Sequence, residues 1–123
     1  MKKSESILIV DDSQMIVKTL CFMAKTEGYE VFCAVNGKDA VEFLDGRKID
    51  LVITDLNMPV MDGMALISKI RSSEDYRYVP VVLFIPDDEN GRKKMIETSG
   101  ATMLFDKGNI KEKIIPLIHK ILS

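Results

Sequence analysis

Three short apolar runs of this chain end directly in charged residues. The runs over residues 7–10, 51–54 and 103–105 stop at Asp11 and Asp12, at Asp55, and at Asp106 and Lys107. Short apolar runs between helical stretches predict buried strands of a parallel sheet. Because the strands of an open parallel sheet end at one edge, where ligands bind, these distant charges are expected to meet in space.

Five apolar runs alternate with stretches of helical periodicity along the chain. The runs begin near Ile7, Val31, Leu51, Val81 and Thr102. Strands that alternate with helices and are joined by right-handed crossovers predict an α/β fold, a three-layer sandwich with the sheet in the middle. Five helices are expected to accompany the five strands. The length of 123 residues fits one domain, expected to span residues 1–123.

Capping and stop signals bound the expected helices. The first is expected from Ser13, a predicted N-cap, to Glu27, with Gly28 as its stop signal. The others are expected after the Asn36-Gly37 turn and over residues 64–72, 89–99 and 109–122. Pro116 lies inside the last of these and removes one backbone hydrogen bond, so a kink or a late start is expected there.

Charge and composition exclude several classes of function. The net charge of −2 gives no reason to expect binding to nucleic acid or to an anionic membrane. The single basic cluster, Arg92-Lys93-Lys94, contains no aromatic residue and is therefore weak support for nucleic-acid binding. The apolar run behind the N-terminal lysines is too short for a signal peptide or a membrane span. A cytoplasmic location is therefore expected. In that reducing compartment Cys21 and Cys33 are interpreted as small buried thiols and not as a disulfide.

Asp11, Asp12 and Asp55 together favour a metal ion. Each aspartate taken alone is typical of a turn or a helix start. Two carboxylates about 4 to 5 Å apart, however, repel each other by roughly 3 to 4 kcal/mol. Three hard oxygen ligands suit Mg²⁺, which keeps several of its waters. Lys107 would add a positive charge from the far side, as phosphate sites often do.

At these residues the chain resembles the receiver domain of two-component response regulators, over essentially its whole length. The matching motifs are Asp11-Asp12, Asp55-Leu56-Asn57-Met58-Pro59, Met61-Asp62-Gly63, Val79-Pro80-Val81-Val82, Gly100-Ala101 and Lys107. The spacing from the acid pair to the single aspartate and then to the lysine is highly specific. The resemblance implies a flavodoxin-like fold with the strand order 2-1-3-4-5, which chemotaxis receivers have.

The resemblance also implies a role for each site residue. Asp55 would accept a phosphoryl group from a histidine kinase or a phosphotransfer protein. Asp12, Asp55 and the backbone carbonyl of Asn57 would bind Mg²⁺, Asp11 would act through a water, and Lys107 would contact the phosphoryl oxygens. Such a protein is not an enzyme in the usual sense, although it can catalyse its own phosphorylation and dephosphorylation. Its output would be an effector protein or a domain outside this chain, and a homodimer through the face of helix 4, strand 5 and helix 5 is a further expectation.

Four residues depart from the family pattern. Ile85 and Pro86 replace a Thr or Ser and a small residue, and so remove a hydroxyl and a backbone N–H that would donate to the phosphoryl oxygens. Each such bond to a charged group contributes about 1.5 to 3 kcal/mol. Leu104 stands in place of an aromatic switch residue, and Gly108 in place of a proline. A weakened switch is expected, and a pseudo-receiver that binds partners without phosphorylation stays open as the alternative.

Enzymes of related fold match these residues less well. A flavodoxin needs hydroxyl- and amide-rich loops for the flavin phosphate, which Asp11 and Asp12 would repel. Phosphatases of the haloacid dehalogenase type need two aspartates two positions apart, whereas these two are adjacent. The sequence contains no P-loop and no glycine-rich dinucleotide fingerprint.

Overall fold

Five parallel strands form one sheet in the order β2-β1-β3-β4-β5 in the computed structural model, which describes residues 5–85 and 98–123. The strands are β1 (Ser6–Val10), β2 (Glu30–Ala34), β3 (Leu51–Asp55), β4 (Val81–Ile85) and β5 (Met103–Asp106). All four neighbouring pairs run parallel. The expected flavodoxin-like fold and its strand order are confirmed.

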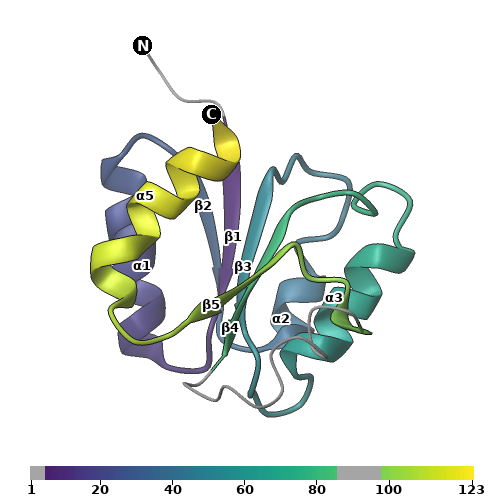
Figure 1. Ribbon diagram of the computed structural model, residues 1–123. Helices are drawn as coiled ribbons and strands as arrows, with labels where there is room; N and C mark the ends of the chain where they lie inside the picture. Colours follow the sequence, from purple (N-terminus) through teal and green to yellow (C-terminus); the bar gives the residue numbers. More distant parts are fainter. Residues whose placement is uncertain (1–4, 86–97) are drawn as a thin grey trace.

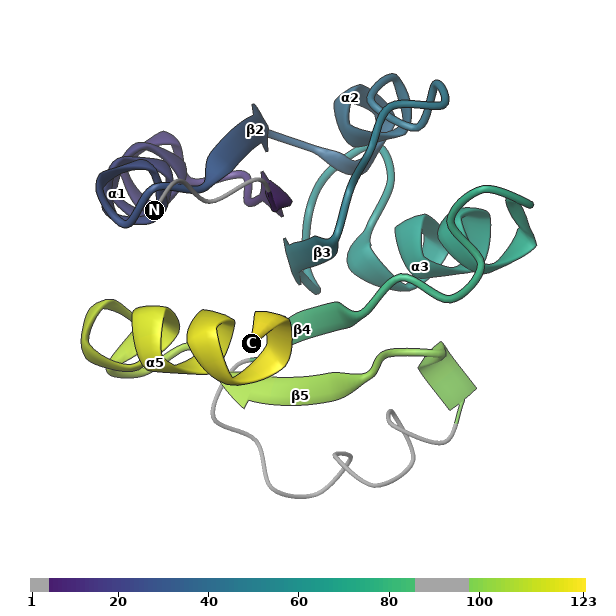
Figure 2. The ribbon, with the colours of Figure 1, turned by 90° about the horizontal axis from the view of Figure 1, so that it is seen from above.

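Helices cover both faces of the sheet. They are α1 (Gln14–Thr26), α2 (Gly37–Val41), α3 (Gly63–Ser72) and α5 (Ile110–Leu122). Figure 1 shows α1 and α5 on one face of the sheet and α2 and α3 on the other, and the view from above in Figure 2 shows the three layers. The helix expected over residues 89–99 lies, up to residue 97, outside the described residues. Within the described parts of the chain, the helices are too short or too polar to cross a bilayer.

Side chains of the central strands alternate between two hydrophobic clusters. Leu8 and Leu83 pack toward α2 and α3, whereas Ile9, Ile53 and Phe84 pack toward α1 and α5. All five side chains are fully buried. Because both faces of the strands are covered, both sets of alternate residues must be apolar, which explains the continuous apolar runs. Each buried side chain of this size contributes about 1.5 to 3 kcal/mol to folding.

The helix termini agree with the sequence signals in part. Ser13 caps α1 as predicted, because its Oγ accepts a hydrogen bond from the backbone N–H of Ile16 at 3.3 Å. Asn36, expected only as part of a turn, caps α2 by accepting from the backbone N–H of Asp39 at 2.7 Å. The late start considered for the last helix is wrong, since α5 begins at its expected position and continues through Pro116.

The interpretation of Cys21 and Cys33 as two buried thiols is wrong. The structure joins their sulfur atoms in a disulfide between α1 and β2. Cys21 is buried, but Cys33 is exposed because β2 forms an edge of the sheet. A spacing of 12 residues predicts no contact by itself. The contact becomes apparent only when α1 is laid across β2 by the crossover that connects β1 to β2.

Arg71 near the end of α3 donates hydrogen bonds to three backbone carbonyls. Its Nε donates to the carbonyl oxygen of Gly100 at 2.9 Å, and its Nη1 donates to the carbonyl oxygens of Arg77 at 2.9 Å and Val79 at 2.7 Å. These carbonyls belong to the connections that precede β4 and β5. Burial lowers the pKa of Arg71, but the guanidinium remains charged and so makes strong hydrogen bonds.

Gly63 allows the start of α3 to approach the end of β3. Its backbone N–H donates to the carbonyl oxygen of Leu56 at 2.8 Å. A Cβ atom at Gly63 would collide with the carbonyl oxygen of Asp55 and would lie 3.0 Å from the Cα of Leu56. Both obstacles are backbone atoms, so no change of side-chain rotamer can relieve the overlap.

Replacing Gly63 by alanine is therefore expected to destabilise the protein by about 2 kcal/mol. Gly108→Ala is the matched control, because a Cβ there meets only Oδ1 of Asp106, at an ordinary 3.5 Å. Urea denaturation of the two variants and the wild type measures the difference. Equal free energies of unfolding for the two variants would contradict the proposed overlap.

Candidate functional site

The register of β1 and β3 brings two of the candidate carboxylates together. Val10 is the partner of Thr54, so the residues that follow them, Asp11 and Asp55, leave the sheet side by side. Together with Asp12 they form a cluster whose ligand oxygens all lie within 4.8 Å of one another. The sequence placed these residues at one edge of the sheet, and the structure brings them to one point.

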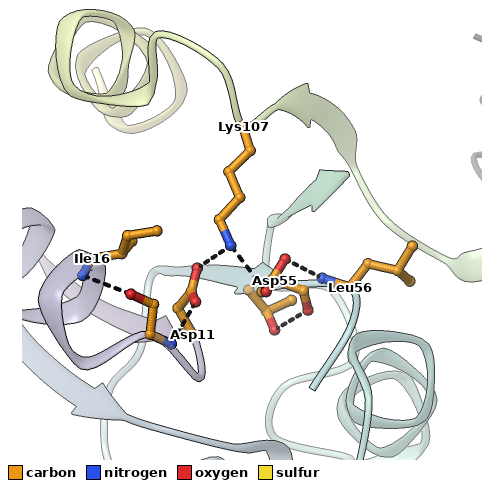
Figure 3. A network of polar contacts seen from close by, with 7 residues as sticks. Asp11, Ile16, Asp55, Leu56 and Lys107 are labelled. Atoms are coloured by element: carbon orange, nitrogen blue, oxygen red, sulfur yellow. Dashed lines mark hydrogen bonds and ion pairs between the residues drawn. The ribbon is translucent and has the colours of Figure 1, made fainter. Parts of the chain in front are cut away.

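Lys107 reaches this cluster from the end of β5. Its Nζ lies 3.1 Å from Oδ2 of Asp55 and 3.0 Å from Oδ2 of Asp11. Figure 3 shows the lysine side chain extending toward the two carboxylates from the opposite side of the site. β5 is two positions from β3 in the sheet, so the length of a lysine side chain is needed to span the intervening strand β4.

Backbone amides hold the remaining oxygens of the two buried carboxylates. Oδ1 of Asp55 accepts from the backbone N–H of Leu56, and Oδ1 of Asp11 accepts from that of Ser13, both at 2.9 Å. Asp11 is fully buried and Asp55 is 6% exposed. Asp12, in contrast, is exposed. The site therefore has two oriented carboxylates on its floor and a third at its rim.

The site disfavours the negative charge of Asp55 and favours the positive charge of Lys107. Burial, followed by the neighbouring charge of Asp11, raises the pKa of Asp55 above its ordinary value, and the contacts with Lys107 only partly offset this. Burial would lower the pKa of Lys107, but its close contacts and charge interactions with Asp11 and Asp55 outweigh this effect, so the pKa of the lysine is raised. One ammonium group does not compensate the carboxylates.

A divalent cation fits this donor set. Three carboxylates and one ammonium leave two net negative charges at the site. Among the described residues, Oδ2 of Asp11 is a buried oxygen without an aligned hydrogen bond, although Lys107 lies 3.0 Å away. Such an oxygen keeps unused acceptor capacity, which a cation or the water of a cation can take up. Oxygen ligands with excess negative charge are those that Mg²⁺ prefers.

Asn57 lies two residues beyond Asp55, on the loop between β3 and α3, and is exposed. Only its position in the sequence, two residues after Asp55, brings it close to the cluster. The ligation of a cation by its backbone carbonyl stays a prediction.

Two of the residues that depart from the family pattern, Ile85 and Leu104, lie in β4 and β5. Ile85 is the last residue of β4 and is 2% exposed. Leu104 packs against the cluster under α2 and α3, whereas Phe105 points to the other face and its ring centroid lies 5.8 Å from that of Phe84. Phe105 therefore does not take the place of an aromatic residue at 104. Pro86 lies outside the described residues.

Comparisons with known proteins agree with this geometry. Residues 7–119 match the family model of the response regulator receiver domain. The chain is 33% identical over 95 residues to the CAI-1 autoinducer sensor kinase/phosphatase CqsS of Vibrio cholerae. The match covers 76% of this chain and 14% of that relative, so the chain corresponds to a small part of the kinase.

Solved structures of receivers have the same fold. The chemotaxis response regulator CheY4 of Vibrio cholerae is 27% identical with a TM-score of 0.87, and the match covers 98% of this chain and 100% of that one. The signal receiver domain of a signal transduction histidine kinase from Syntrophus aciditrophicus is 30% identical with a TM-score of 0.86, over 97% of this chain and 90% of that one. This chain, with its acid cluster at the carboxyl edge of a 2-1-3-4-5 sheet, belongs to the response regulator receiver domains of two-component signalling.

Proposed function

We propose that the chain is a phosphoacceptor receiver in which Asp55 takes a phosphoryl group from a histidine kinase or a phosphotransfer protein. The observation that carries this proposal is the convergence of Asp11, Asp12 and Asp55 within 4.8 Å, with Lys107 in contact with two of them. The reaction depends on Mg²⁺ and takes place in the cytoplasm. Phosphoryl transfer of this kind is catalysed mainly by positioning and charge, which these residues supply.

In the proposed reaction a carboxylate oxygen of Asp55 attacks the phosphorus of a phosphohistidine. A P–O bond forms, the P–N bond breaks, and its electron pair returns to the imidazole nitrogen. The backbone N–H of Leu56 fixes one oxygen of Asp55 and so orients the carboxylate for attack. Lys107 exchanges its contact with Asp55 for one with the phosphoryl oxygens. Its charge then stabilises the transferred group.

The same residues would hold the metal. Asp12, Asp55 and the backbone carbonyl of Asn57 would be direct ligands, and Asp11 would act through a bound water. When bound, Mg²⁺ neutralises charge on the carboxylate and on the phosphoryl group, which lets two anions approach. The buried oxygen of Asp11 that lacks an aligned hydrogen bond supports this assignment.

We further propose that the chain works as a single receiver domain over residues 1–123 and signals by contact with an effector protein or with a domain outside this chain. The face of helix 4, strand 5 and helix 5 is the surface that we propose for a partner or for a second copy of the chain, as the family resemblance implies. It is not an enzyme in the usual sense and would catalyse only its own phosphorylation and dephosphorylation.

The pseudo-receiver is the weaker alternative. It rests on Ile85, Pro86 and Leu104, which remove donors and the aromatic switch residue. The acid cluster and Lys107, by contrast, are complete and in contact. A binding module that had lost phosphorylation would have no use for buried like charges, so the retained cluster favours the phosphoacceptor.

Without metal, Asp55→Asn is expected to stabilise the protein at pH 7 by on the order of 1 kcal/mol, or roughly 3 to 6 °C in Tm. The pKa of Asp55 is raised in the folded state, so at this residue the folded protein binds a proton more readily than the unfolded chain. The stability of the wild type therefore falls as pH rises from the ordinary pKa of an aspartate through the raised pKa of Asp55. The advantage of the variant should therefore shrink between pH 7 and pH 4.

Thermal unfolding of the metal-free proteins measures this effect, with the exposed Asp75→Asn as control. Adding Mg²⁺ at about ten times its Kd should stabilise the wild type and Asp75→Asn by about 1.4 kcal/mol and Asp55→Asn much less. A destabilised, metal-free Asp55→Asn protein would contradict the electrostatic account of the site.

Incubation with acetyl phosphate and Mg²⁺ is expected to add the mass of one phosphoryl group, because the cluster positions a carboxylate for attack. Intact-mass spectrometry measures the gain. Asp75→Asn should gain the same mass and Asp55→Asn none. A wild type that gains nothing while it binds Mg²⁺ would support the pseudo-receiver instead.

Ile85→Thr is expected to bind a beryllofluoride mimic of the phosphoryl group about tenfold more tightly than the wild type, because it restores one hydroxyl donor. Ile85→Val is the control, since valine has the shape of threonine without the hydroxyl. Two-dimensional NMR titrations with Mg²⁺ measure the affinities and the shifts of β5. In the wild type those shifts should be small. Large shifts throughout β5 of the wild type would contradict a weakened switch.

A further inference from the structure

The two cysteines lie where α1 crosses the edge of the sheet. Cys21 is on α1 and 4% exposed, and Cys33 is on β2 and exposed. Their Cα atoms are 6.9 Å apart and their sulfur atoms are joined in a disulfide. No residue of the acid cluster belongs to this pair, and phosphoryl transfer to Asp55 does not use it.

We propose that Cys21 and Cys33 form a redox-modified site that exchanges with small thiols and disulfides of the glutathione type, and that its state controls how firmly the acid loop is held. The acid loop is the connection from β1 to α1 that contains Asp11 and Asp12. This inference rests on the proposed function in two respects: the cytoplasmic location and the Mg²⁺ site.

Exposure and compartment both favour a reversible bond over a permanent one. In a reducing compartment a disulfide that persists is rare, and those that form are transient, catalytic or redox-sensing. Exposed disulfides are the ones that small thiols attack. Cys33 is an exposed residue of the edge strand β2, whereas Cys21 is buried on the face of α1 that packs against the sheet. Exchange therefore begins at Cys33.

The oxidation is balanced by one molecule of the disulfide reagent. The thiolate of Cys33 attacks a sulfur of glutathione disulfide, a mixed disulfide forms, and one glutathione thiolate leaves. The thiolate of Cys21 then attacks the sulfur of Cys33 and expels the second glutathione. The two cysteine thiols lose two protons and two electrons, and the glutathione disulfide gains them and becomes two glutathione thiols. Reduction is the reverse sequence.

A chain of hydrogen bonds connects the cysteine pair to the acid loop. Ala34, the neighbour of Cys33 on β2, accepts through its carbonyl oxygen from the backbone N–H of Asp11 at 3.2 Å. The carboxylate of Asp11 accepts from the backbone N–H of Ser13 at 2.9 Å, and Ser13 caps the helix that carries Cys21. The disulfide closes this chain into a ring of contacts that passes through Asp11.

Closing the ring should make the acid loop stiffer. With the disulfide formed, α1 and β2 cannot separate. The two hydrogen bonds of the loop, from Asp11 to Ala34 and from Ser13 to Asp11, are therefore held in place. A preorganised set of ligands binds a cation with a smaller loss of conformational entropy. The oxidised protein is therefore expected to bind Mg²⁺ about threefold more tightly than the reduced protein.

The first measurement is the redox equilibrium of the full chain. The protein is equilibrated in glutathione buffers of varied ratio, free thiols are trapped with N-ethylmaleimide, and the number of labels is counted by intact mass. The labelled fraction should rise from almost none to almost all across the series. A pair that stays oxidised, or stays reduced, in every buffer would overturn the proposal.

The second measurement compares the two redox forms. Hydrogen exchange of the amides of Asp11 and Ser13 should be at least threefold slower in the oxidised form, and calorimetric titration with Mg²⁺ should give the affinity difference. Cys33→Ser leaves the buried Cys21 in place and should match the reduced form in every buffer. Equal exchange rates in the two forms would overturn the coupling.

The two proposals fail in different ways. If neither redox form takes up Mg²⁺, the phosphoacceptor function fails, while the hydrogen exchange of Asp11 and Ser13 still decides whether the cysteines control the loop. If both forms bind Mg²⁺ with the same affinity and exchange equally, the redox inference alone fails.

Discussion

Asp11 and Asp55 bring like charges from neighbouring strands into a site from which water is almost excluded. The register of β1 against β3 fixes this encounter, and the apolar packing of both faces of the sheet fixes the register. A slip by one residue would turn every buried side chain of a strand to the other face, so the core holds the carboxylates together against their repulsion. Lys107, which follows β5, offsets part of the repulsion between the two carboxylates. The fold and the site are thus two aspects of one pairing of strands.

The sequence predicted the strand order through a family resemblance and the strand positions through the apolar runs. It also predicted the meeting of the acids, because residues directly after parallel strands share an edge. Contacts that depend on how layers overlap left no such signal. The pairing of Cys21 with Cys33 required α1 to be laid over β2. The bonds of Arg71 go to backbone carbonyls, and any residue type at the accepting positions offers the same oxygen.

The acid cluster and the neighbouring strands β4 and β5 differ in how far they follow the family pattern. The acid cluster and the lysine are complete, whereas β4 and β5 have the aliphatic residues Ile85, which belongs to the core cluster under α2 and α3, and Leu104, which packs against it. Phe105 packs on Phe84 on the opposite face, where it adds to the core under α1 and α5. β5 takes part in both regions, because Lys107 at its end contacts the acid cluster while Leu104 within it packs against the core.

The guanidinium of Arg71 gathers the connections before β4 and β5 at a single point on α3. If the connection ahead of β5 moved by even an ångström, the bond to Gly100 would lengthen beyond hydrogen-bonding range. A displacement of β5 too small to break this bond would therefore pull on the C-terminal end of α3. The N-terminal end of α3 lies against the carbonyl of Asp55. The two ends of this short helix thus connect the end of β3, which carries Asp55, to the segment before β5 by a route that does not involve the side chains of β4.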